Sequence, residues 1–170
     1  MTITVFVVLL SLGFIVYVAR LMRRRKTETD AARLYKQLQP IHLPALLNLL
    51  NPDDLSFLRI NLSHSDFLAL KRRRTRALMD YVRRIGLNAR VLTSIGALRR
   101  QSALPDVAAA GQTLASHALT TRILAVRTLF FLELELVLPF FDTNLAPTIK
   151  AYEKARARLD ESSATSLAAR

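Results

Sequence analysis

The chain has 170 residues and a formal net charge of +12, and twenty of its twenty-five basic residues are arginine. It contains no cysteine, which excludes disulfides and cysteine-ligated metals, and its four glycines cannot form a glycine-rich phosphate-binding loop. The basic balance suits anionic partners such as lipid head groups, nucleic acid or an acidic protein. A GC-rich genome combined with positive-inside bias near a membrane would give the same excess.

The apolar segment at the N-terminus is the most informative feature. Residues 3–19 carry no charge, and as a helix they span about 25 Å, which is short but workable for a hydrocarbon core of about 30 Å. Basic residues flanking a span stay in the cytoplasm. We therefore predict a single-pass anchor over residues 1–22, with the N-terminus outside and the rest cytoplasmic, held at a cell membrane. The membrane-flanking residues are Arg20, Arg23, Arg24, Arg25 and Lys26.

Two alternatives to an anchor fit this segment less well. A cleaved signal peptide carries its basic residues before the apolar segment and small residues at the cleavage site, whereas here the basic residues follow and Tyr17 and Val18 precede Ala19. A buried helix of a soluble domain needs charged residues on a solvated face, and none occurs between Ile3 and Ala19. The sequence therefore favours an uncleaved anchor.

Everything after the anchor has the pattern of helices. A basic juxtamembrane extension is predicted over 23–40, ending before Pro40, and a short helix follows from Pro44 to Leu50. Asn51 is the predicted cap of a helix that ends near Asn61.

The next helices are long. Ser63 and Asp66 form a predicted capping box at the start of a basic helix, which either ends at Gly86, with Asn88 capping a further helix, or continues through it. Further helices are expected from Ser102 or Pro105 to about Leu138, and then after a cap at Asp142 or Thr143. The fold class is therefore all-α: one transmembrane helix, then a cytoplasmic bundle of about four to five helices over 41–160 and a frayed tail over 161–170.

The basic helix is predicted to be amphipathic. On a helical wheel its apolar residues occupy one half, and the opposite half carries arginines. Guanidinium groups bind phosphate or carboxylate oxygens two at a time, so we expect these arginines to face anionic lipid or an acidic partner. A solvated face without a partner is the alternative. The five arginines, called the arginine stripe below, are Arg72, Arg73, Arg76, Arg83 and Arg84.

Four further charged residues fall on apolar faces. Lys71 and Arg74 lie in the apolar half of the same wheel, and Glu133 and Glu135 lie within an apolar segment near Pro139. Because buried charges need partners, we expect at least one of these acids to approach Lys71 or Arg74 within about 8 Å. Separate extension of each side chain to solvent is the alternative.

Residues 123–141 are apolar enough to suggest a second span. Their apolar side chains favour insertion by about 4–8 kcal/mol, but Arg127, Glu133 and Glu135 oppose it by about 2.5–3.5 kcal/mol each. We therefore expect a central helix of the bundle rather than a span. Its coiled-coil-like stripe is predicted to form the core. The stripe consists of Leu119, Ile123, Val126, Phe130, Leu134, Val137 and Phe141.

No motif for catalysis, cofactor binding or metal binding is recognisable. His42, His64 and His117 share no motif, and the acids are too dispersed to suggest an acid–base pair. We therefore predict no enzyme, no cofactor and no metal, but a membrane-tethered adaptor or scaffold that binds a protein partner. The alternatives are a membrane-tethered nucleic-acid-binding module, which no zinc or RNA-recognition motif supports, and a small membrane-associated enzyme of unknown class.

Overall fold

The structure, a computed structural model, describes residues 31–138 and 142–168. These residues form helices and no strand, so the all-α prediction is confirmed. The helices are α2 (Ala31–Lys36), α3 (Leu43–Leu49), α4 (Pro52–Asn61), α5 (His64–Arg99), α6 (Pro105–Val137) and α7 (Ala146–Ala168). None of the described helices is long and apolar enough to cross a membrane. The predicted anchor over 1–22 and the basic residues that flank it, up to Lys26, lie outside the described residues.

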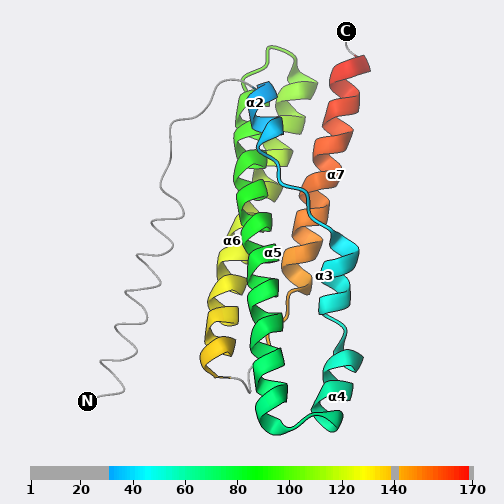
Figure 1. The fold of residues 1–170 in the computed structure, drawn as a ribbon. Coiled ribbons are helices and arrows are strands. Elements are labelled where there is room, and N and C mark those ends of the chain that lie inside the picture. Colours follow the sequence, from blue (N-terminus) through cyan, green and yellow to red (C-terminus); the bar gives the residue numbers. More distant parts are fainter. Residues whose placement is uncertain (1–30, 139–141, 169–170) are drawn as a thin grey trace, which may run out of the picture.

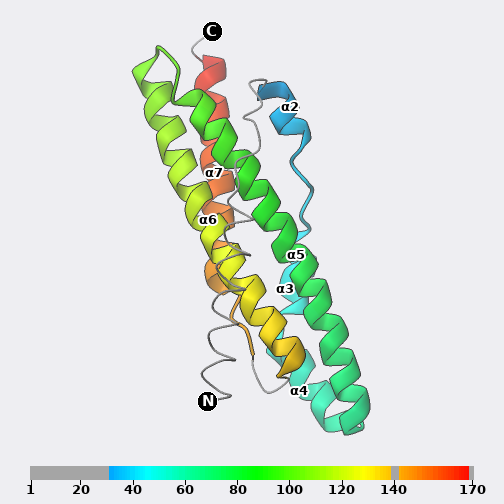
Figure 2. The same cartoon turned by 90° about the vertical axis from the view of Figure 1, so that its left-hand side faces the viewer.

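Three long antiparallel helices make up most of the fold (Figure 1). α5 has 36 residues, which gives a helix about 54 Å long. It shares its largest interface with α6, and α7 packs mainly on α6. Residues 31–62, called the strap, run along α5 in the opposite direction, so that α2 lies beside the end of α5 and α4 beside its start. Figure 2, turned by 90°, shows the left-hand side of that view, where α5 and α6 lie in front.

Local signals determine the starts of α4 and α5. Asn51 Oδ1 accepts a hydrogen bond from the Asp53 amide at 3.1 Å. Ser63 Oγ accepts one from the Asp66 amide at 3.2 Å and donates to Asp66 Oδ2 at 2.6 Å. Both predicted caps are confirmed. They satisfy amides that have no partner within the helix.

One helix boundary had two alternatives and another prediction is wrong. Of the two alternatives for α5, the continuous helix is confirmed, because Gly86 has no positive φ and α5 continues through it to Arg99. α7 is not capped by Asp142 or Thr143, because Asn144 Oδ1 accepts the Ala146 amide at 2.9 Å. α7 also runs to Ala168, well into the range predicted as a frayed tail.

The core consists of two clusters along the bundle. The first, at the α4 end, joins α3 to the lower halves of the long helices and includes Leu46, Val82, Ile85, Leu132 and Leu145. The second, at the α2 end, joins α2 to their upper halves and includes Leu34, Leu92, Ile95, Leu114 and Leu159. The strap therefore contributes buried side chains to both clusters.

The predicted core stripe of α6 is wrong for most of its length. Leu119, Ile123 and Val137 are 40%, 56% and 74% exposed, and Phe141 lies outside the described residues. Val126 is buried, whereas Phe130 and Leu134 are half-buried. α6 buries a different face, rich in small side chains, which lets its backbone approach α5 closely. That face includes Gly111, Ala118, Thr121, Ala125 and Thr128.

Candidate functional site

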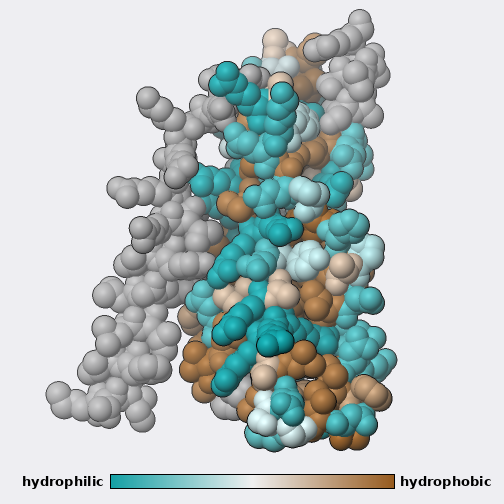
Figure 3. All heavy atoms as spheres, in the orientation of Figure 1, coloured by the Kyte–Doolittle hydropathy of each residue, from teal (hydrophilic) through white to brown (hydrophobic). Residues whose placement is uncertain are grey.

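All five arginines of the stripe are exposed on α5. Arg83 Nη1 lies 3.0 Å from Asp80 Oδ1, one turn away on the same helix. Among the described residues, no ion pair forms with the other four, which are Arg72, Arg73, Arg76 and Arg84. Figure 3 shows hydrophilic residues over α5, with hydrophobic residues on either side of its lower part. The arrangement is a row of cations carried by a helix whose other face is in the core.

The exposed apolar side chains of α6 lie beside this row. α5 and α6 are antiparallel, and a Cβ on Gly86 of α5 would meet Ala125 of α6 at 3.6 Å. This register brings Ile123, two residues before Ala125, level with the exposed Leu87 of α5. The face thus combines arginines on one helix with apolar residues on the next.

Arg122 of α6 is half-buried and lies close enough to Arg90 of α5 for their charges to interact. Its Nη2 atom is buried and has no hydrogen bond. Burial, and then the positive charge of Arg90 on α5, lower the pKa of Arg122 below its ordinary value. Sequence patterning missed this residue, because a single arginine within an otherwise apolar and alanine-rich helix resembles a solvated position. Two cations, Arg90 and Arg122, therefore lie close together where α5 packs on α6.

Charged residues meet at the α4 end of the same interface. Lys71 Nζ lies 3.9 Å from Glu135 Oε1 and donates to Asp142 Oδ1 at 2.7 Å. Glu135 also accepts hydrogen bonds from the Thr75 hydroxyl and the Thr143 amide, each at 3.2 Å. The arrangement ties the segment before α7 to α5 and α6.

The other two predicted ion-pair residues are placed differently. Arg74 is half-buried and donates to the Asn51 carbonyl at 2.9 Å, so that it joins α5 to the start of α4. Burial lowers the pKa of Arg74, and the charges of Asp54 and Glu135 oppose that shift. Glu133 is exposed and does not belong to the cluster, because it lies on the outer side of α6. Asp142 was missed as a partner because its position suggested a helix cap.

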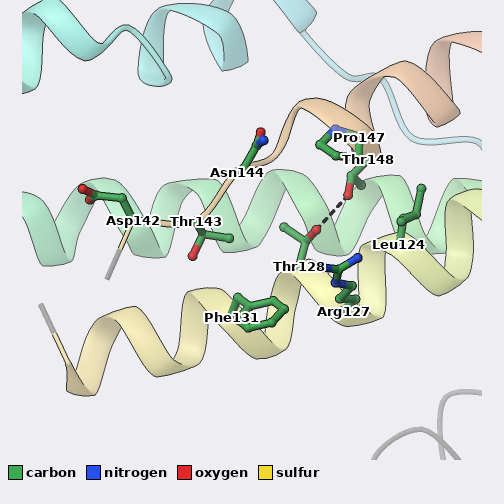
Figure 4. Close-up of a pocket in the computed structure, with 9 residues that line it drawn as sticks. All are labelled: Leu124, Arg127, Thr128, Phe131, Asp142, Thr143, Asn144, Pro147 and Thr148. Atoms are coloured by element: carbon green, nitrogen blue, oxygen red, sulfur yellow. Dashed lines mark hydrogen bonds between the residues drawn. The ribbon is translucent and has the colours of Figure 1, made fainter. Parts of the chain in front are cut away.

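A shallow pocket of about 270 Å³ opens between α6 and the start of α7 (Figure 4). The hydroxyls of Thr128 and Thr148 are hydrogen bonded across it at 2.7 Å, and the guanidinium of Arg127 lies 5.6 Å from the centre of the Phe131 ring. The volume falls below the usual range for small-molecule sites, roughly 300–1,000 Å³. The polar groups around it contain no nucleophile–base pair.

The described residues contain no cluster of histidine and acidic side chains that could hold a metal ion. His42 and His64 are exposed and His117 is half-buried, on three different helices or their starts. The strongest candidate site is therefore the surface formed by α5 and α6. Comparison of the chain with protein families, curated proteins and solved structures finds no match to any of them.

Proposed function

We propose that this protein is a membrane-tethered adaptor that binds a partner protein through the arginine stripe of α5. The observation that carries the proposal is the row of exposed arginines, four of which form no ion pair with any described residue. The opposite face of α5 is buried, so the row is held on a rigid support. The rigid helix fixes the spacing of the guanidinium groups, so that several of them can bind carboxylates of one partner at once.

The tether in this proposal is the uncharged segment 3–19 followed by its basic cluster. α2 begins at Ala31, five residues after Lys26, and five extended residues reach at most about 17 Å. α2 packs beside the end of α5, where Arg99 Nη2 donates to the Tyr35 hydroxyl at 2.7 Å. In this proposal the α2 end of the bundle is the end nearest the bilayer.

The position of the stripe along α5 favours a protein partner over lipid. Arg76 and Arg72 precede Arg99 by 23 and 27 residues, which corresponds to about 35–40 Å along the helix. A bundle that stands on its tether holds these arginines beyond the reach of the lipid head groups. They then face the cytoplasm, where an acidic partner can bind them.

The test is crosslinking and capture of the full-length, membrane-inserted protein. We expect partners captured by the native chain to be lost when all five stripe arginines are changed to serine. A matched control changes Arg59 and Arg156, which are exposed on α4 and α7, and should leave capture intact. Unchanged capture by the stripe variant would overturn the proposal, and capture that disappears after nuclease treatment would assign the stripe to nucleic acid instead.

A further inference from the structure

We infer that the strip of surface along the contact of α5 with α6, called the groove below, is the docking site for an acidic amphipathic helix of the partner, with Arg122 as its anchor. The inference rests on the proposed function and deepens it, because it names the chemistry of the partner and adds residues outside the arginine stripe.

Arginines form one wall of the groove. Arg76, Arg83 and Arg90 are spaced seven residues apart on α5 and therefore lie in one row along the helix. Gly86, between Arg83 and Arg90, faces Ala125 of α6, so the row borders that helix. Arg76 and Arg83 are exposed and Arg90 is half-buried.

The opposite wall is apolar. Leu119, Ile123 and Val137 are exposed on α6, and Phe130 between them is half-buried. A contiguous apolar row of this kind marks an interaction surface rather than a solvated one. Because the chain carries a net charge of +12, a second copy would bring its own cations against the arginine wall and be repelled. The complementary occupant has acidic and apolar residues side by side.

Arg122 lies on α6, next to Ile123 in the chain and within reach of the charge of Arg90 on α5. Its buried Nη2 lacks an acceptor, and the charge of Arg90 acts on the same guanidinium. Leaving a buried donor unsatisfied costs stability, as does the repulsion between two like charges. Arg122 is half-buried as a whole, so a change of rotamer can turn its guanidinium toward the groove. A carboxylate placed there would accept from Arg122 and neutralise Arg90.

The division of the groove into one cationic and one apolar wall favours a helix over a flat bilayer. A helix presents acidic residues along one edge and apolar residues along the next, spaced three or four residues apart, and so matches both walls at once. A membrane surface would have to reach both rows, whereas Arg76 lies 23 residues before Arg99, which corresponds to about 35 Å from the α2 end of the bundle.

The test uses the full chain in nanodiscs of neutral lipid and a fluorescent helical peptide with glutamates on one face and leucines on the adjacent face. We expect binding that weakens about tenfold or more in Arg122→Gln, because a charge-assisted hydrogen bond is lost, and similarly in Ile123→Ser. The matched controls Arg156→Gln on α7 and Ile60→Ser on α4 are exposed and should bind like the native chain. Thermal unfolding should find Arg122→Gln at least as stable as the native chain, because the substitution removes a buried cation without a partner.

Several outcomes would overturn the inference. Equal affinity of the native chain and Arg122→Gln would do so, as would equal affinity for a scrambled peptide of the same composition. Vesicles of anionic lipid that bind more tightly than the peptide, with dependence on Arg122 and Ile123, would assign the groove to the membrane. Peptide binding that appears only after residues 1–22 are deleted would assign it to the chain's own N-terminal segment. Partner capture that needs the stripe but neither Arg122 nor Ile123 would also overturn the inference while leaving the proposed function in place.

Discussion

The two ends of the α5–α6 interface are built in different ways. At the α2 end, Gly96 and Gly111 bring the two backbones together, because a Cβ on Gly96 would lie 2.8 Å from the Gly111 carbonyl oxygen. At the α4 end, Lys71, Thr75 and Glu135 fill the interface with paired polar groups. One end therefore depends on the absence of side chains and the other on charge compensation. The same helix pair should respond to substitution differently at each end.

Substitution of Gly96 at the α2 end should lower the free energy of unfolding the most. Gly96→Ala places a methyl group 2.7 Å from the Ala115 backbone nitrogen, and since backbone cannot move aside cheaply we expect a loss of about 3 kcal/mol or more. Gly86→Ala is the matched control, because its Cβ would meet only Ala125 Cβ at 3.6 Å. That substitution should raise stability by up to about 1 kcal/mol through helix propensity. Thermal and denaturant unfolding of both variants would contradict the close approach if Gly96→Ala were as stable as Gly86→Ala.

Substitution of Lys71 at the α4 end should give the second-largest loss of stability. Lys71→Met leaves the buried Glu135 carboxylate with only the Thr75 and Thr143 hydrogen bonds, and we expect a loss of about 2–3 kcal/mol. The double variant Lys71→Met/Glu135→Leu removes both charges and should recover most of that loss. Unfolding free energies of the two single variants and the double variant measure the coupling. Additive losses would mean that Lys71 and Glu135 do not stabilise each other.

Removal of the Asn88 side-chain amide, which lies on α5 between these two ends, should cost less stability and should act mainly on the strap. Asn88 Oδ1 accepts the Gln39 amide and Nδ2 donates to the Gln39 carbonyl, each at 2.8 Å, and Nδ2 also lies 3.0 Å from the Tyr152 hydroxyl. Asn88→Ala should cost about 2 kcal/mol and raise amide exchange in the strap more than in α6. The exposed Asn48→Ala serves as control. Uniform exchange across the bundle would argue against a local role.

The smallest effect should be the pH dependence at the α2 end. Burial, and then the charges of Lys154 and Arg158, lower the pKa of His117 below its ordinary value. The unfolded chain then binds this proton more readily, so stability falls as the pH drops through about 6.5 and levels off below the lowered pKa. We expect the melting temperature to fall slightly between about pH 7 and pH 5, and to fall less in His117→Gln. An identical fall in both proteins would rule out His117 as the cause.

Local features of the fold could be predicted from the sequence, because they depend on neighbouring residues. Asn51 and Ser63 cap the helices that follow them, and the short helix before Asn51 was also expected. The proximity of Lys71 and Glu135 was expected on the ground that buried charges need partners. The contact between Asp142 and Lys71 was not expected, because it depends on how the segment before α7 crosses the bundle.

The buried face of α6 could not be predicted. α6 carries one row of large apolar residues, such as Ile123, and another of small residues, such as Ala118 and Ala125. Hydrophobic spacing favours the first row, but close approach to α5 requires the second. The sequence therefore predicted the arginines of the candidate site on α5 but not its exposed apolar residues on α6. Those residues could be assigned to the surface only from the burial of α6 in the structure.

The Asn88 amide binds both backbone groups of Gln39, as a neighbouring β-strand would. Because side-chain hydrogen bonds hold the first part of the strap, residues 31–41, this part can detach from the bundle by local unfolding. Loss of the Asn88 bonds, together with the Arg99–Tyr35 bond, would let residues 31–41 detach and expose Leu34 and Ile41, while the three long helices stay packed. A protease should therefore make its first cut near Pro40. A partner that binds this segment could detach it at a lower cost in free energy than unfolding the three long helices would require.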